Sequence, residues 1–135
     1  MKTFKSPTGG FTLVEIMVIV AILLIVSALA IPNFFRARKR SQATRMLDDL
    51  RMIDGALDLY AVETNKQSGA SVTWPDMQSY LKKDSVLYTS SGYDLFGNPY
   101  SSGNLTVGTL PKLNSATYAK LSDVIPSDFW SPYYP

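Results

Sequence analysis

The sequence contains neither cysteine nor histidine among its 135 residues. Disulfides and thiolate chemistry are therefore excluded, as are imidazole bases and the usual zinc ligand sets. No nucleophile–base pair or metal constellation stands out among the remaining residues, and isolated carboxylates are expected on any protein surface. We therefore expect no enzymatic activity.

The chain also has only a small excess of positive over negative charge. The net charge of +2 comes from Lys2 and Lys5, since the rest of the chain carries eleven basic and eleven acidic residues. This balance is unlike the footprint of a nucleic-acid-binding protein, so no nucleic-acid partner is predicted. The positive charges are unevenly spread, however, and four of them form a basic block: Arg36, Arg38, Lys39 and Arg40.

One long apolar run dominates the first part of the chain. Residues 11–31 carry a single charge, Glu15, and as a helix they would measure about 31 Å, enough to cross a bilayer core. About a hundred residues of ordinary soluble composition follow Pro32 and hold most of the aromatic side chains. By its length the chain forms one domain.

Two simple interpretations of this run stay open. As a secretory signal peptide, it would combine Lys2 and Lys5 with an A-x-A-like site at Ala28-Leu29-Ala30. The run is longer than the ~7–15 residues of a signal-peptide core, however, and it contains an acid. As a plain single-pass anchor, it would keep Glu15 near the lipid headgroups.

The two ends of the run form a third and more specific pattern. Gly10 is followed by Phe11 and by T-L-V-E at residues 12–15, and the run closes on Ala30-Ile31-Pro32. In this combination the sequence resembles the class III signal of type IV pilins and type II secretion pseudopilins. The resemblance implies that residues 1–10 are a leader, that a prepilin peptidase cuts between Gly10 and Phe11, and that the same enzyme N-methylates Phe11. Glycine at the cut lets the backbone extend into a protease cleft without steric cost.

The resemblance also gives Glu15 a role. A carboxylate in hydrocarbon costs free energy and needs a partner. Cleavage would create a positive amine on Phe11, and methylation leaves that charge in place. In this family, the amine of an incoming subunit is proposed to meet Glu15 of a neighbour already in the filament. Such a pair would fix the axial register between otherwise apolar helices.

The hydrophobic periodicity continues beyond Pro32 and predicts one helix from about Phe11 to Thr64, roughly 80 Å long. Pro32 removes a backbone donor, so we expect a kink there, with a simple end of the span as the alternative. Gly55 lowers helix propensity and would let another element approach closely. An apolar stripe in the second half is expected to be core: Ala43, Met46, Leu47, Leu50, Ile53, Leu57 and Tyr60. Charged residues are expected on the other side: Arg45, Asp48, Asp49, Arg51 and Asp54.

The basic block has two interpretations. It is either a membrane-proximal patch on anionic headgroups or in water, or a partner for the acidic 48–58 face of a neighbouring subunit, with Asp48 and Asp49 foremost. The positive-inside rule alone would put the chain after the span in the cytoplasm, because more positive charges follow the span than precede it. The family resemblance implies the opposite orientation.

Residues 65–135 are predicted to form a small domain. Thr73, with Asp76 three residues later and a proline in the first turn, predicts a capped helix ending near Lys83. Beyond it, Ser91 to Leu110 has aromatic and β-branched runs broken by turn residues, which predicts two or three short antiparallel strands. Residues 114–125 favour one or two helical turns, and the proline-rich tail 126–135 is expected to be extended and packed down.

The segment Asp94-Leu95-Phe96-Gly97-Asn98-Pro99-Tyr100 is similar to the D-x-x-G-N-P-Y turn of major pseudopilins, whose C-terminal region can bind calcium. The acids nearby are Asp94, Asp123 and Asp128, and no clustered D-x-D spacing supports a site. We therefore expect no metal and no cofactor, with calcium at these acids as the alternative. Many pilins close a C-terminal loop with cysteines, and their absence here favours a pseudopilin.

Together these patterns predict an α+β fold in which a long N-terminal helix, transmembrane in its first half, packs on a small antiparallel-sheet domain, as in the pilin lollipop. The expected function is that of a structural subunit of a pseudopilus that drives protein export. The alternatives are a type IV pilin for adhesion, motility or DNA uptake, and a monomeric membrane-anchored binding domain.

The resemblance further implies the partners and the location. The chain would assemble with itself and with related minor subunits, after contacts with prepilin peptidase, the inner-membrane assembly platform and membrane lipid. It would be a single-pass protein of the bacterial inner membrane, with its C-terminal domain in the periplasm or outside the cell.

Overall fold

The computed structural model describes residues 9–101 and 105–135, so Lys2, Lys5 and most of the predicted leader lie outside the described residues. The chain divides into two compact units, one ending at Arg36 and the other covering Ala37–Pro135. The elements, in chain order, are α1 (Leu13–Thr64), β1 (Ser71–Val72), α2 (Trp74–Gln78), α3 (Val86–Thr89), β2 (Leu105–Thr106), α4 (Ser115–Leu121) and the 3₁₀ helix η1 (Ser127–Trp130).

The first unit is the apolar first part of α1. Its described side chains are exposed along the whole run, including Phe11 and the residues up to Arg36. Ser27 donates its hydroxyl to the carbonyl of Leu23 at 2.7 Å, so this polar group is satisfied inside the helix. The backbone stays helical through Pro32, so the proline does not end the helix. The predicted kink stays a prediction.

The second unit is built on the remainder of α1. The predicted stripe is confirmed as core, since all its members are buried except Tyr60, which packs partly buried at its edge. The core also takes up side chains from every later segment, among them Val72, Met77, Leu121 and Trp130. Burial of these side chains removes apolar surface from water and holds the unit together. The prediction that Asp49 faces away from the core is wrong: it is only 8% exposed.

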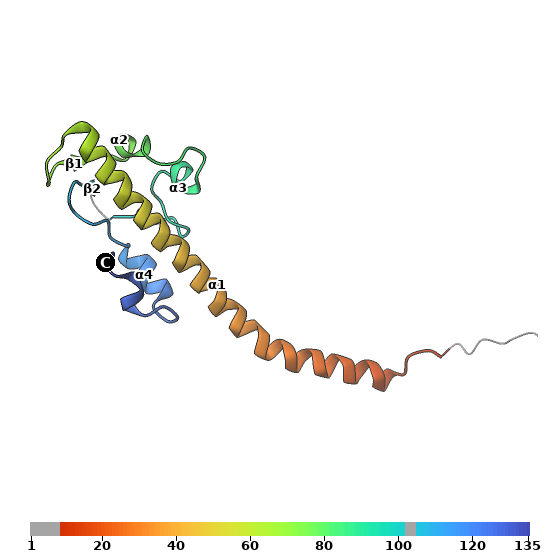
Figure 1. Cartoon of the computed structure of the whole chain (residues 1–135). Helices are drawn as coiled ribbons and strands as arrows, with labels where there is room; N and C mark the ends of the chain where they lie inside the picture. Colours follow the sequence, from red (N-terminus) through yellow and green to blue (C-terminus); the bar gives the residue numbers. More distant parts are fainter. Residues whose placement is uncertain (1–8, 102–104) are drawn as a thin grey trace, which may run out of the picture. The chain divides into compact units, whose positions relative to one another are not determined.

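A small antiparallel sheet completes the α+β fold, as predicted. Within the described residues, β1 pairs with β2, with Ser71 opposite Thr106 and Val72 opposite Leu105. Figure 1 shows the sheet and the short helices gathered along the second half of α1. The strands differ from the prediction because β1 comes before α2, and because Tyr93 and Pro99 form only an isolated bridge in the predicted strand region.

Each of the three short α-helices follows a polar N-cap residue. Thr73 is the N-cap of α2, but that helix ends at Gln78 and does not reach the predicted Lys83. Ser85 caps α3, a helix that the sequence analysis did not predict, by accepting from the backbone N–H of Tyr88. Asn114 caps α4, which confirms the predicted helical turns. The tail is packed down as predicted, but part of it forms η1 and is not extended.

Candidate assembly site

The first turn of α1 is closed by a reciprocal pair of hydrogen bonds. The backbone N–H of Glu15 donates to Thr12 Oγ1 at 3.3 Å, and the backbone N–H of Thr12 donates to Glu15 Oε2 at 3.3 Å. This is a capping box, and it explains why α1 begins at Leu13, two residues after the predicted start. The sequence analysis missed it, although T-x-x-E at residues 12–15 is its sequence signature.

The capping box places the Glu15 carboxylate at the N-terminal end of the helix, next to the predicted cleavage point. One oxygen, Oε2, accepts from Thr12, so the side chain turns back toward Phe11. The helix dipole favours a negative charge in the first turn. Glu15 is therefore held near the position where cleavage would create a positive amine.

The predicted cleavage point itself is accessible. Gly9, Gly10 and Phe11 are exposed and precede the helix. A Cβ built on either glycine would meet no described atom within 4 Å. Packing inside the chain therefore leaves this segment open to an enzyme.

The apolar run after Glu15 is long enough and apolar enough, by length and composition, for α1 to cross a membrane. The most apolar part of it is wholly unburied in the single chain. An exposed apolar surface of this extent marks a contact with lipid or with other protein.

The residues of the basic block differ in whether they have an ion-pair partner. Lys39 Nζ contacts both carboxylate oxygens of Asp123, at 2.8 and 2.6 Å, and so ties α1 to the segment after α4. Arg38 and Arg40 form no ion pair with any residue that the structure describes. No signal in the sequence linked Lys39 to an acid 84 residues away.

The two acids predicted to meet the basic block also differ. Asp48 is exposed and pairs with Arg51 across one helical turn, at 3.2 Å, as its spacing allows. Asp49 is buried and accepts a hydrogen bond from the Tyr100 hydroxyl at 2.7 Å. Desolvation raises the pKa of Asp49, although the Tyr100 hydrogen bond acts in the opposite direction. Of the two acids, only Asp48 is therefore at the surface.

Tyrosine hydroxyls attach three later segments to carboxylates on α1. Besides the Tyr100 contact with Asp49, Tyr133 donates to Asp54 at 3.1 Å and Tyr80 donates to Glu63 at 2.7 Å. Burial and then the Asp49 hydrogen bond raise the pKa of Tyr100 far above its usual value. All three hydroxyls therefore stay protonated donors at neutral pH. These contacts orient the small domain on the helix.

In the turn that resembles the pseudopilin D-x-x-G-N-P-Y sequence, the Asp94 carboxylate is bonded to donors of the chain itself. Asp94 Oδ1 accepts from the backbone N–H groups of Phe96 and Asn98, at 2.8 and 2.9 Å, and Oδ2 accepts from the Thr117 hydroxyl. Thr117 Oγ1 in turn accepts from Asn98 Nδ2 at 2.9 Å. The described residues contain no group of three acids that could hold a metal. These residues do not fit the calcium site that the family implies.

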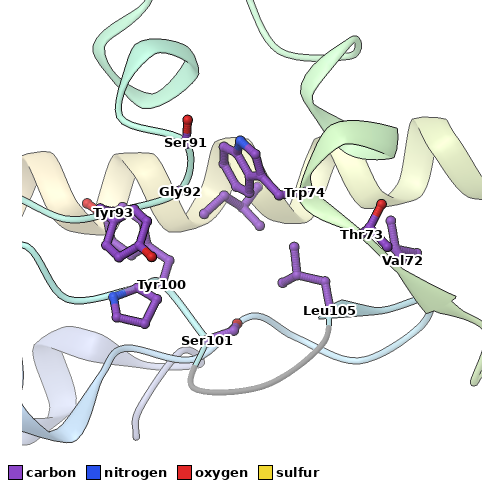
Figure 2. Close-up of a pocket in the computed structure, with 11 residues that line it drawn as sticks. Val72, Thr73, Trp74, Ser91, Gly92, Tyr93, Tyr100, Ser101 and Leu105 are labelled. Atoms are coloured by element: carbon purple, nitrogen blue, oxygen red, sulfur yellow. The ribbon is translucent and has the colours of Figure 1, made fainter.

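A cavity of about 270 Å³ lies beside this turn. Figure 2 shows the rings of Trp74, Tyr93 and Tyr100 around it, with Leu105 on another side. The described residues that line it include no acid or base, so the cavity offers no counter-charge to an ionic ligand.

Comparison with known proteins agrees with these features. The family described as the prokaryotic N-terminal methylation motif matches residues 5–31. The type II secretion system core protein G of Pseudomonas aeruginosa is 35% identical over 111 residues, which cover 71% of this chain and 73% of that protein. The core protein G of Aeromonas hydrophila is 28% identical over 107 residues, with the same two coverages. No solved structure matches the chain.

Pilins also match, over shorter segments. The type IV major fimbrial protein of Dichelobacter nodosus is 33% identical over 70 residues, which cover 52% of this chain and 44% of that protein. Matches to three other core protein G relatives span 41%, 55% and 64% of those proteins. The chain belongs to the type IV pilin and type II secretion pseudopilin family.

Proposed function

We propose that this protein is a pseudopilin of a type II secretion system, a structural and non-enzymatic subunit that assembles into a periplasmic pseudopilus. The observation that carries the proposal is the exposed apolar run of α1, which begins directly after a capping box at Thr12 and Glu15. Such a surface needs cover, first from lipid and then from other copies. Relatives named core protein G support the secretion system over a pilus.

Processing is the first step of the proposal. Prepilin peptidase cuts between Gly10 and Phe11 and methylates the new amine, while the apolar run stays as a single membrane anchor. Mass spectrometry of the mature N-terminus tests this step. We expect a chain that starts at N-methylated Phe11, and a chain that starts at Met1 or near Ile31 would refute it.

Assembly is the second step. The amine of Phe11 on an incoming subunit pairs with Glu15 of a neighbour, while the small domain stays on the periplasmic side. Related minor subunits and the inner-membrane assembly platform are the expected partners. Deletion of the gene should abolish secretion of the cognate proteins and leave surface motility unchanged. If motility or adhesion fails and secretion persists, the chain is a type IV pilin.

The structure leaves fewer charged residues available for pairing between subunits than the sequence suggested. Lys39 and Asp49 are engaged inside the chain, whereas Asp48 is exposed in a surface pair with Arg51. A neighbour would therefore use Arg36, Arg38 or Arg40 to meet Asp48. Reversal of Arg38 should lower filament yield, and simultaneous reversal of Asp48 should restore it. Absence of any rescue would count against this pairing.

The protein is also proposed to need no calcium. The Asp94 carboxylate is satisfied by three donors of the chain itself. This proposal extends to the other two acids, because Asp123 is paired with Lys39 and Asp128 lies exposed on η1.

A further inference from the structure

The cavity beside the Asp94 turn has walls made of flat rings. Trp74 of α2 lies on one side of it, and Tyr93 and Tyr100 lie on another (Figure 2). Pro99, which pairs with Tyr93 in an isolated bridge, adds a fourth ring to the lining. Two segments of the chain therefore present aromatic and proline rings to the same small space.

Two of these rings are held in place by the chain itself. Tyr100 is buried, and its hydroxyl donates to Asp49 at 2.7 Å. Gly92 has a φ of 83°, and a Cβ built on it would come within 2.7 Å of the Trp74 ring. Glycine at this position therefore lets the loop pack directly on the indole. Walls that are fixed before a ligand arrives lower the entropic cost of binding.

The lining also carries hydroxyl groups that can donate to a ligand. Ser91 and Tyr93 are exposed, and their side chains form no hydrogen bond with any residue that the structure describes. Ser101 Oγ accepts from the backbone N–H of Lys112 at 3.4 Å, and its own proton is still available for donation. The cavity therefore combines neutral donors with apolar rings.

Two of the serines that line the cavity have an unfavourable backbone conformation. Ser91 and Ser101 have φ angles of 53° and 75°, and they are two of the four non-glycine residues with positive φ in the described part of the chain. This region of φ is sterically costly for a residue with a Cβ. Backbone strain of this kind is concentrated at ligand sites and switch regions. The two serines therefore favour this cavity as a ligand site.

The lining restricts the chemistry of the ligand. An ammonium group could lie over the rings, but it would offer the hydroxyls no acceptor. A hydrocarbon chain would bury those hydroxyls without partners, which costs free energy. A proline in an extended peptide meets both requirements, because its ring packs on aromatic faces and the neighbouring carbonyls accept hydrogen bonds. Its amide nitrogen carries no proton, so it needs no acceptor from the site.

We propose that this cavity binds a proline-rich, extended segment of a partner protein, with Trp74, Tyr93 and Tyr100 as the walls that hold the proline rings. Aromatic-lined grooves recognise polyproline II segments in this way, because that helix is preformed and its carbonyls are free. The chain's own tail contains prolines too, but Tyr133 within it is buried in the core, so the tail of a second copy is already engaged. The proposal adds a partner surface and does not rest on the proposed function.

Titration with a peptide tests the ligand class. Full-length protein in detergent is titrated with a blocked oligoproline peptide, and a glycine–serine peptide of the same length is the control. Tryptophan fluorescence is the readout, because the chain has only two tryptophans and Trp130 is fully buried, so a change on binding reports Trp74. We expect saturable binding of oligoproline with a dissociation constant below about 1 mM and no response to the control peptide. No saturable binding of oligoproline in that range would overturn the proposal.

Substitutions test the location. Tyr93→Ala removes one wall and should raise the dissociation constant at least about tenfold, with little change in thermal midpoint because Tyr93 is 51% exposed. Tyr134→Ala is the matched control, since Tyr134 is 46% exposed and lies outside the lining, and it should bind like the wild type. Tyr93→Phe keeps the ring and removes the hydroxyl, so a loss of a few-fold is expected. Equal binding by Tyr93→Ala and the wild type would overturn the site.

Three further ligands test the alternatives. Binding of N-acetylglucosamine or of tetramethylammonium in place of oligoproline would overturn the ligand class. Tighter binding of a peptide with the sequence of residues 126–135 than of oligoproline would make a second copy the occupant and overturn the partner. These titrations need no filaments, so their failure leaves the proposed function untouched, and loss of assembly leaves the cavity proposal untouched.

Discussion

Glu15 has one role that the structure shows and a second that we propose, and three substitutions distinguish them. Within the chain it accepts from the Thr12 backbone in the capping box, and between chains it would neutralise the amine of Phe11. Glu15→Gln keeps an oxygen that can accept the capping hydrogen bond but removes the charge. Thr12→Ala removes the hydroxyl of the cap but keeps the charge. Glu15→Ala removes both the charge and the acceptor.

The two roles differ in the free energy that each would contribute. Loss of a helix cap costs about 0.5–2 kcal/mol, and the two 3.3 Å contacts here are long, so we expect the lower end for Thr12→Ala. Two unit charges about 4 Å apart attract by about 4 kcal/mol at an effective dielectric constant near 20. That attraction corresponds to roughly a thousandfold in an association constant. Desolvation of the two ions offsets part of it, so we expect a loss of at least about tenfold for Glu15→Gln.

Filament yield, measured against membrane-inserted and processed monomer, is the assay. Glu15→Gln and Glu15→Ala should both abolish or nearly abolish filaments, while cleavage and membrane insertion remain at wild-type levels. Thr12→Ala should assemble at a yield within a few-fold of wild type. If Glu15→Gln assembles normally while Thr12→Ala fails, the residue acts through its cap, and the charge argument is refuted.

Three further predictions concern the second unit. Asp94→Ala should destabilise it by roughly 2–4 kcal/mol, because three donors lose their common acceptor. A calcium chelator should leave the thermal midpoint of the wild type unchanged, and a lower midpoint with the chelator would contradict the proposal that the turn holds no metal. The raised pKa of Asp49 means that the folded state binds this proton more tightly than the unfolded state, so this group's contribution to stability falls as pH rises from about 4 through the raised pKa. The stability of Asp49→Asn relative to wild type should therefore increase over that pH range, and a flat difference would refute the sign. Lys39→Ala should cost less than about 1 kcal/mol, because its ion pair with Asp123 is partly exposed, and Arg40→Ala serves as the control with no measurable cost.

The sequence predicted the elements that depend on local periodicity and caps. The apolar stripe from Ala43 to Leu57 follows from helical spacing, and Thr73 marks a helix start by its own chemistry. It failed where the deciding contact is distant in the chain. Asp49 lies three residues after Met46 and four before Ile53, on the side of the buried stripe, but its charge assigned it to the surface. Tyr100, 51 residues away, supplies the hydrogen bond that satisfies it there.

The same distinction applies to the strands and the turn. The strand β2 falls within the predicted strand region 91–110, whereas β1, more than thirty residues earlier, was not predicted, because two residues carry too little alternation to be recognised. The D-x-x-G-N-P-Y turn was recognisable by its sequence, but the hydrogen bond from Thr117 to its Asp94 was not, because that threonine comes from α4.

Assembly of such a helix requires more than apolar surface. Inside a bilayer, exchanging lipid contacts for helix contacts brings no hydrophobic gain, since lipid tails are as apolar as the side chains they replace. The apolar run alone therefore cannot select a register, and a charge pair such as the one proposed at Glu15 supplies the selection that the run lacks. Met52, Leu59 and Val62 lie beyond the run, and on the proposed periplasmic side they would face water. There, burial of apolar surface contributes about 25 cal/mol per Å². The charge pair at Glu15 would thus select the register within the membrane, and burial of Met52, Leu59 and Val62 would supply free energy of assembly outside it. On this reasoning, a polar substitution at Met52, Leu59 or Val62 should weaken filaments without shifting their register, whereas a substitution at Glu15 should remove the register itself.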